Sequence, residues 1–391
     1  MIRRSGPIAA TVLAVALVLS ACGGGGDESG AAAGPAAPAA EAGGPLDLTG
    51  ACPAKVVLQQ DWQPEAEHGS MYSLVGPDYQ IDTSTKTVTG SLVTQGVDTG
   101  VDVEVRPGGP NVGFQPVPAL MYLDDTITLG AVNSDAAIAA FADQPTVAVA
   151  SQLTVSPQIL MWDPESHPGM STIREVAASG AAVLTSGDIV PALLAGKGII
   201  QKGQIDTSYE GTPARFVSDP TILQQGFATA EPYVYQNEIQ EWGRPVGYEP
   251  LANYGYSIYP EPLAVRADKL EALRPCLQKL VPIMQRSQID YLKDPAPTNR
   301  LIVELVEAYQ TGWSYSPGVA EYSAKAQVEQ GFVKNDPASG VFGKLDPDRM
   351  QEIVSTFGPI LQSQGTITSV PDAASLYTND FIDPDIKMEG P

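Results

Sequence analysis

Short apolar runs bounded by turn residues recur along the first two thirds of the chain, and segments with helical periodicity separate them. Runs of apolar and β-branched residues, or strict alternation in one case, predict strands over residues 55–60, 101–105, 126–132, 146–150, 181–184, 212–217 and 248–258. Helices are predicted between them over residues 62–72, 136–141, 171–179 and 189–195. The third of these helices begins at Ser171 or Thr172 and carries Glu175 three or four positions later, which is a capping-box pattern.

The last third of the chain has a different character. Amphipathic periodicity with few strands predicts long helices over residues 269–292, 298–309, 319–329 and 347–364. Alternating strands and helices followed by a helical tail are typical of an α/β protein with helices added at its end. A chain of 391 residues is also longer than one hydrophobic core usually holds, so two lobes are expected.

The first residues predict export. Arg3 and Arg4 precede an apolar stretch over residues 8–19, which ends in Leu19-Ser20-Ala21-Cys22. This ending resembles the bacterial lipobox, which implies a signal peptide over residues 1–21, a lipid on Cys22 and a place on the extracytoplasmic face of the cell membrane. An ordinary secretory signal with an incidental cysteine is the alternative. Residues 22–50 are rich in glycine, alanine and proline and predict a flexible tether.

The cysteine count follows from that anchor. Of three cysteines, Cys52 and Cys276 remain as an even pair in an oxidising compartment once Cys22 is lipidated, and we predict a disulfide between them. Two buried free thiols are the alternative. A bond would place the start of the folded chain and part of the helical region in one lobe.

Charge and absent motifs exclude several functions. The formal net charge of −23 repels nucleic acid, so no nucleic-acid partner is expected. The sequence contains no G-x-S-x-G, no P-loop and no H-E-x-x-H. Two histidines far apart, without a cysteine cluster, argue against a transition-metal site. We therefore predict no catalytic residue, no metal and no cofactor.

The segment after the first predicted strand is the strongest candidate for a ligand site, because ligands of open α/β sheets bind at the carboxyl ends of strands. It contains Asp61, Trp62 and His68. The Trp62 ring offers a flat apolar face for stacking, and His68 can form one hydrogen bond. A core role for Trp62 and a surface or capping role for His68 are the alternatives.

Further candidates follow later predicted strands or open helices. They are Phe114, Gln115, Ser156, Trp162, Thr185, Ser186, Glu231 and Tyr233. Thr185 and Ser186 precede a helix and equally fit a simple capping role. The turn after Arg106 contains two glycines, whose backbone N–H groups either face an anion or form a tight surface turn, with Arg106 as a candidate anion partner.

Four motifs carry a resemblance to a known family: Asp61-Trp62-x-Pro64-x-x-x-His68-Gly69, Val112-Gly113-Phe114-Gln115-Pro116, Ala230-Glu231-Pro232-Tyr233 and Tyr377-Thr378-Asn379-Asp380-Phe381. The chain resembles solute-binding proteins of the thiamine-pyrimidine-precursor and nitrate/sulfonate/taurine type. The resemblance implies an α/β type-II periplasmic-binding-protein fold with two α/β lobes, a hinge and a helical C-terminal extension. The first lobe would comprise residues 51–146 and 250–391, the second residues 147–249, and the last motif would form a terminal helix.

The same resemblance implies a function. The chain would act as a monomeric, non-enzymatic solute-binding lipoprotein that captures a small heteroaromatic or anionic organic molecule and delivers it to the permease subunits of an ABC importer. Fungal pyrimidine synthases also resemble this family and use an equivalent histidine together with a lysine-bound pyridoxal phosphate, so an enzyme on the same fold is the alternative. No lysine of this chain stands in a recognisable motif for that cofactor. A sensor or adhesion subunit with a vestigial cleft is a third option.

Overall fold

The computed structural model of the protein describes residues 37–389. The expected signal peptide, the expected lipidation site at Cys22 and the beginning of the expected tether lie outside this range. Within residues 37–389, no helix combines the length and the apolar character that crossing a membrane requires.

The larger of two β-sheets has seven strands in the order β2-β3-β4-β1-β5-β12-β6. Its strands are β1 Lys55–Gln59, β2 Gln80–Asp82, β3 Thr87–Thr94, β4 Val97–Arg106, β5 Ile127–Ala131, β6 Thr146–Ala150 and β12 Leu263–Arg266. The almost continuous apolar run of β1 suits its place in the sheet, since this strand runs parallel to β4 on one side and to β5 on the other.

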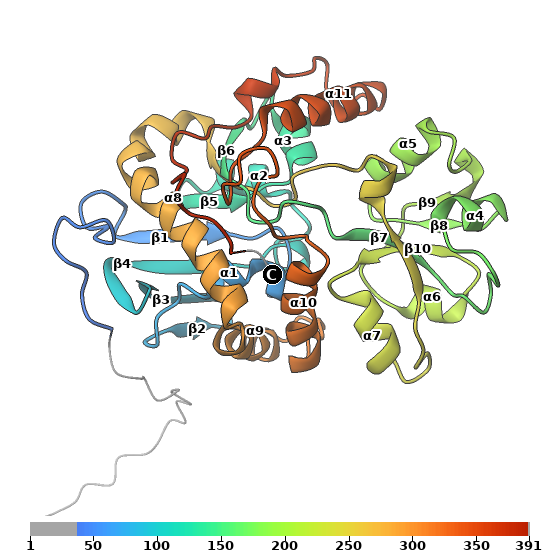
Figure 1. Cartoon of the computed structure of the whole chain (residues 1–391), viewed down its shortest axis with the longest axis horizontal. Helices are drawn as coiled ribbons and strands as arrows, with labels where there is room; N and C mark the ends of the chain where they lie inside the picture. The colour runs from blue at the N-terminus through green and yellow to red at the C-terminus, as the bar shows by residue number, and fades with distance from the viewer. Residues whose placement is uncertain (1–36, 390–391) are drawn as a thin grey trace, which may run out of the picture. The chain divides into compact units, whose positions relative to one another are not determined.

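The smaller sheet has five strands in the order β11-β7-β10-β8-β9. Its strands are β7 Gln158–Trp162, β8 Val183–Leu184, β9 Ile205–Asp206, β10 Leu223–Phe227 and β11 Gly247–Pro250. Figure 1 shows these strands grouped together with helices α4 to α7.

Both sheets contain the same five-strand arrangement, β4-β1-β5-β12-β6 in one and β9-β8-β10-β7-β11 in the other. In each, four strands are parallel and the fourth in order is antiparallel. The antiparallel strand is the first one formed after the chain crosses from the other sheet. The crossings span residues 151–157 and 251–262. The first lies later than the division expected after residue 146, because β6 still pairs with β12.

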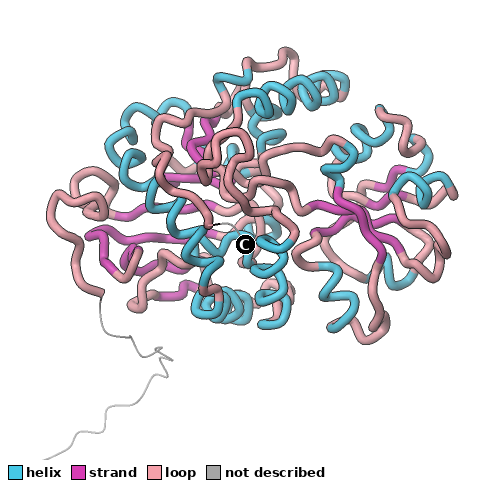
Figure 2. Tube along the Cα trace, in the orientation of Figure 1, coloured by secondary structure: helices cyan, strands magenta, loops and turns pink. Residues whose placement is uncertain are grey.

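Helices cover the sheets (Figure 2). They are α1 Gly69–Tyr72, α2 Val117–Leu123, α3 Ser134–Ala140, α4 Ile173–Ala178, α5 Ile189–Gly196, α6 Ala214–Ser218, α7 Glu231–Asn237, α8 Leu270–Lys293, α9 Ala296–Tyr309, α10 Pro317–Glu329 and α11 Pro347–Ser363. The four long helices predicted for the last third are confirmed as α8 to α11. The capping box is confirmed at Thr172, whose side chain accepts a hydrogen bond from the Glu175 amide.

Three local predictions are wrong. Residues 212–217, read as a strand from their β-branched and aromatic content, enter helix α6, because Pro213 fixes a backbone angle that suits a helix start. The strand predicted over 248–258 ends at Pro250, where a 3-10 turn follows. Residues 377–381 form no helix: Tyr377 pairs in a bridge with Ala148, the Asn379 side chain bonds both the amide and the carbonyl of Leu345, and a turn follows.

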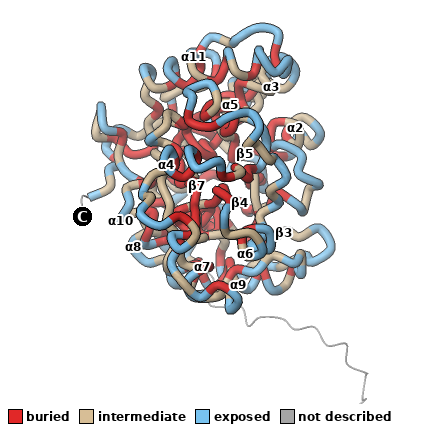
Figure 3. Tube along the Cα trace, turned by 90° about the vertical axis from the view of Figure 1, so that its right-hand side faces the viewer, coloured by how far each residue is buried: buried red, intermediate tan, exposed pale blue. Residues whose placement is uncertain are grey.

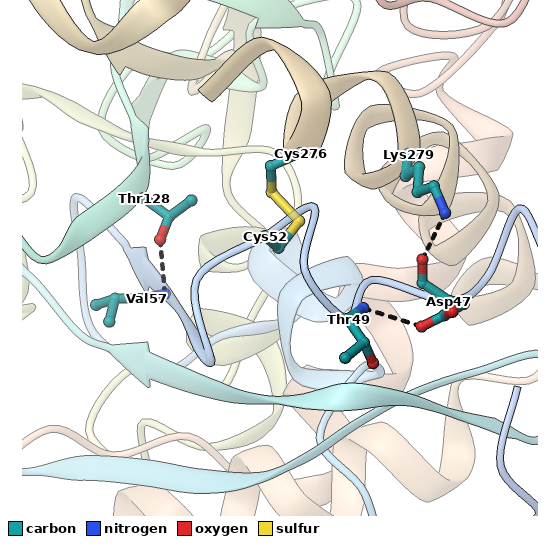
Figure 4. The surroundings of a disulfide bond; sticks show 7 residues. All are labelled: Asp47, Thr49, Cys52, Val57, Thr128, Cys276 and Lys279. Atoms are coloured by element: carbon teal, nitrogen blue, oxygen red, sulfur yellow. Dashed lines mark hydrogen bonds between the residues drawn. A yellow bond between two sulfur atoms is a disulfide. The ribbon is translucent and has the colours of Figure 1, made fainter. Parts of the chain in front are cut away.

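The disulfide prediction is confirmed, and the bond fixes the beginning of the folded chain. Cys52 is linked to Cys276 of α8 (Figure 4), and the Lys279 ammonium of the same helix donates to the Asp47 carbonyl at 2.6 Å. Leu48 is fully buried in the core of the larger sheet. Residues 44–50, expected to be flexible tether, are therefore part of the fold. Figure 3 shows the labelled strands β4, β5 and β7 in the buried interior.

Candidate ligand-binding site

The loop after β1 brings Asp61 and His68 together. Gln60 continues the sheet, because its amide donates to the Arg106 carbonyl at 2.8 Å, and the chain then turns into a 3-10 helix, Ala66–His68. His68 is 1% exposed, and its Nε2 lies 3.0 Å from Asp61 Oδ1. The same Nε2 lies 3.1 Å from Oε2 of Glu261. One ring nitrogen therefore faces two carboxylates.

Sheet topology explains this convergence. Asp61 follows β1 and Asn133 follows β5, and these two strands are parallel. Glu261 precedes β12, which runs antiparallel to β5. All three residues therefore lie at the same end of the strands of the larger sheet. Asn133 connects the other two, since its Nδ2 donates to Asp61 Oδ2 at 3.0 Å and its Oδ1 accepts from the Glu261 amide at 3.0 Å. Glu261 has a positive φ of 52°, which is rare outside glycine.

The charges of this cluster are poorly balanced. Burial acts against a charged His68, but Glu261 and Asp61 outweigh it and hold the pKa of His68 well above its usual value. Burial raises the pKa of Glu261 to about 7, and repulsion from Asp61 adds to this. Burial and repulsion from Glu67 raise the pKa of Glu65 well above its usual value. Among residues 37–389, His68 is the only side chain that forms an ion pair with Asp61 or Glu261.

A cavity of about 210 Å³ opens beside this cluster, at the carboxyl ends of β1, β4 and β5. Predicted residues Asp61, Trp62, Phe114 and Gln115 line it together with Asn133. The Trp62 and Phe114 ring centroids are 6.0 Å apart, and 59% of Phe114 is exposed. The structure thus brings four of the predicted residues to one cavity and places His68 directly behind Asp61.

Glu231 and Tyr233 lie on helix α7 of the smaller sheet. Glu231 Oε2 accepts from the Phe227 amide at 2.7 Å, and its Oε1 lies 3.4 Å from the Tyr209 hydroxyl. Burial raises the pKa of Glu231 to about 7, with repulsion from Glu67 contributing. The Tyr233 ring packs on Tyr322 of α10, with centroids 5.4 Å apart. Glu231 and Tyr233 do not line the cavity beside Trp62.

The remaining predicted residues lie away from the cavity beside Trp62. Trp162 lies in the core on β7, where a Cβ on Gly247 would approach its Nε1 within 2.5 Å. The Ser156 hydroxyl accepts from the Gln158 amide at 3.3 Å, and the Thr185 hydroxyl donates to the Gly187 carbonyl at 3.1 Å. The Ser186 amide donates to Gln225 Oε1 at 2.7 Å. None of these four side chains lines the cavity.

Arg106 and the following turn do not form an anion site. The Arg106 guanidinium pairs with Glu104 at 2.6 Å and with Asp124 at 2.7 Å, so its charge is already matched. The Gly108 amide donates to the Trp62 carbonyl at 2.6 Å. A Cβ on Gly108 would lie 2.5 Å from the Asp61 carbonyl carbon. Gly108 thus permits close approach of the loop that carries Asp61 and Trp62, and its own N–H group is used inside the fold.

No family model and no curated protein matches this chain. Solved structures do match. The periplasmic aliphatic sulphonate-binding protein SsuA of Escherichia coli has a TM-score of 0.51 and 11% identity, over 87% of this chain and 95% of its own. A ligand-binding component of an ABC-type import system from Staphylococcus aureus, with zinc bound, has a TM-score of 0.50 and 14% identity, over 85% of this chain and 100% of its own. The chain has the periplasmic-binding-protein fold.

Two residues that complete the site escaped the sequence reading. In this periplasmic-binding-protein fold the second crossing returns the chain to the larger sheet beside β1 and β5, and so delivers Glu261 to Asp61 and His68. The only sequence signal is an acidic residue between Pro260 and Pro262. Asn133 stands directly before the helix α3, where an asparagine is read first as a cap, yet its side chain makes no capping bond.

Proposed function

We propose that the chain is an extracytoplasmic solute-binding protein that holds a small, flat, heteroaromatic molecule in the cavity beside Trp62. The observation that carries this proposal is the cavity itself. It combines the rings of Trp62 and Phe114 with a carboxylate and two amide side chains, from Asp61, Gln115 and Asn133. A few polar groups on an otherwise apolar wall are typical of sites that orient a small organic ligand.

The electrostatics favour a ligand with N–H donors over an anion. The cavity wall formed by the described residues holds no lysine or arginine, and Asp61 is its charged group. Arg106, the candidate anion partner, is neutralised by Glu104 and Asp124. A sulphonate, the class bound by the Escherichia coli protein, would meet a carboxylate here and no cation. Of the heteroaromatic and anionic ligands expected from the sequence, we retain the heteroaromatic one.

Closure of two lobes would retain the ligand. We assign residues 158–250 to one lobe and the rest of the folded chain to the other, with the crossings at 151–157 and 251–262 as the hinge. Several contacts join the lobes in this state. The Tyr322 hydroxyl donates to the Ala228 carbonyl at 3.1 Å, Ser316 bonds Glu238, and Gln364 Nε2 donates to the Asp188 carbonyl at 3.4 Å. The Tyr233 and Tyr322 rings also pack across the lobes. These contacts would break on opening.

Delivery to an ABC importer is the natural use of such a protein. The Staphylococcus aureus protein of the same fold is a component of an ABC-type import system. A lipid on Cys22 would keep the binding protein beside a permease and raise its effective concentration there. The protein would act as a monomer and would catalyse no reaction.

The test is identification of the ligand followed by matched variants. Protein purified without denaturation is unfolded, and the released small molecules are identified by mass spectrometry. Adding the identified compound should raise the melting temperature of the ligand-free protein. The compound itself should be recovered without chemical change. Trp62→Ala and Phe114→Ala should each weaken binding at least tenfold, because both rings line the cavity.

Leu123→Ala is the matched control, since Leu123 is 74% exposed and does not line the cavity. It should bind the compound as tightly as the unaltered protein. Equal affinity of all three variants would remove the cavity from the binding role. Conversion of the compound into a product would favour the enzyme alternative.

A further inference from the structure

The cluster behind the cavity has the donor set of a metal site. Asp61 offers Oδ1, His68 offers Nε2 and Glu261 offers Oε2, and these three atoms all lie within 4.8 Å of one another. Asp61 and His68 come from the loop after β1, whereas Glu261 lies far along the chain, just before β12 of the same sheet. Sequence spacing alone therefore gives no hint of the arrangement.

The distances fit a small divalent ion. In tetrahedral zinc sites the bonds to nitrogen and oxygen are about 2.0–2.2 Å long, which separates neighbouring donor atoms by about 3.3 Å. His68 Nε2 lies 3.0 Å from Asp61 Oδ1 and 3.1 Å from Glu261 Oε2. Shifts of a few tenths of an ångström would open the space for an ion bonded to all three.

The present contacts leave one donor atom without a partner. Glu261 is 6% exposed, and its Oε2 forms no hydrogen bond of acceptable geometry although it faces His68. The reason is that a single N–H on Nε2 points to one oxygen only, and that oxygen is Asp61 Oδ1. A buried carboxylate oxygen without a hydrogen bond is costly, whereas a cation between the three donors would satisfy both carboxylates at once.

The charge of the three side chains, their access from the cavity and the contacts that orient them agree with a bound metal ion. Two carboxylates and a neutral imidazole carry two negative charges, which match a divalent cation. The Asp61 side chain is 23% exposed and lines the cavity, so an ion can enter there and keep a coordination position open to it. Asn133 orients both acidic ligands through its bonds to Asp61 Oδ2 and the Glu261 amide, as outer-sphere residues of metal sites do.

We propose that Asp61, His68 and Glu261 bind one divalent first-row transition-metal ion, with an open coordination position facing the cavity. One imidazole nitrogen with two carboxylate oxygens suits Zn²⁺, Fe²⁺ or Mn²⁺ better than Ca²⁺ or Mg²⁺, which prefer oxygen ligands throughout. The site extends the cavity of the proposed function but is independent of it, since metal binding needs no organic ligand.

The experiment titrates chelator-treated full-length protein with Zn²⁺ in a calorimeter. We expect one ion per chain with a dissociation constant in the micromolar range or below. Glu261→Gln and His68→Gln should each weaken binding at least a hundredfold, and Glu261→Gln preserves the size of the side chain should the histidine variant fail to fold. Co²⁺ bound at the site should show the visible absorption bands of an ion with a low coordination number. These bands should be absent in Glu261→Gln.

His167→Gln is the matched control. His167 is the other histidine and is also buried, and its Nε2 lies 2.9 Å from the Thr221 carbonyl beside the smaller sheet. It should bind Zn²⁺ like the unaltered protein. Absence of a one-to-one site, or equal binding by Glu261→Gln, would overturn the proposal and leave only scattered surface carboxylates as ligands. Trp62→Ala should keep Zn²⁺ while it loses the organic compound, which separates the two proposals.

Discussion

Reduction of the Cys52–Cys276 disulfide should cause a large loss of stability. The bond joins residues that are 224 positions apart, so it closes a very long loop in the unfolded chain. The chain-entropy relation for a loop of this length gives a loss of about 5 kcal/mol in the free energy of unfolding at 25 °C. Cys276 is fully buried in α8 and packs in the core of the larger sheet.

Chemical unfolding of the oxidised and the reduced protein, followed by tryptophan fluorescence, measures this difference. A Cys52→Ala/Cys276→Ala double variant is the control, because it lacks the bond under both conditions and should match the reduced protein within about 1–2 kcal/mol. The slope of free energy against denaturant should also rise on reduction, since the freed chain exposes more surface when it unfolds. A difference below about 1 kcal/mol between oxidised and reduced protein would refute the loop-entropy reasoning for this bond.

Two further predictions concern the site. Glu231→Gln should reduce the loss of stability between pH 5 and pH 8. The folded-state pKa is raised from 4.5 to about 7, so the carboxyl stabilises the fold in its protonated form, and this contribution disappears as the pH rises through that interval; at about 1.4 kcal/mol per pKa unit the effect reaches about 3 kcal/mol. Equal pH dependence of both proteins in denaturant titrations would contradict the burial of this carboxyl. Gly108→Ala should lower the free energy of unfolding by about 1–3 kcal/mol, because its Cβ would lie 2.5 Å from the Asp61 carbonyl carbon. Gly196→Ala, with no atom within 4 Å, should change it by less than about 1 kcal/mol, and similar losses for both would argue against the close approach.

Local signals predicted the parts of the fold that depend on neighbouring residues. The Thr172–Glu175 box and the amphipathic helices of the last third follow from periodicity and capping, which act within one or two turns. Residues 212–217 show the limit of composition, because Pro213 stands at the start of helix α6 in a segment whose apolar content predicts a strand. Asp61 and Trp62 of the motif after β1 line the cavity, since sheet topology fixes where a strand ends; their role in ligand binding stays a prediction.

The rest of the site depends on contacts between distant segments. Glu261 reaches His68 only because the chain returns to the larger sheet in the antiparallel β12. Trp162 has the same composition signal as Trp62, a tryptophan at a strand end, but faces the core. Arg106, a candidate anion partner in the sequence, pairs with Glu104 and Asp124, which no spacing rule identifies as its partners. Such pairings require three-dimensional information.

The position of Glu261 in the second crossing has a thermodynamic consequence. The segment that carries this carboxylate also links the two sheets, whereas Asp61 and His68 are fixed on the larger sheet. An ion or ligand bound between these three side chains would therefore favour one conformation of the second crossing over another. By thermodynamic linkage, the conformation of the crossing must alter the affinity for the bound ion or ligand by the same factor. Occupancy of the buried cluster and the conformation of the second crossing would then report one and the same conformational equilibrium.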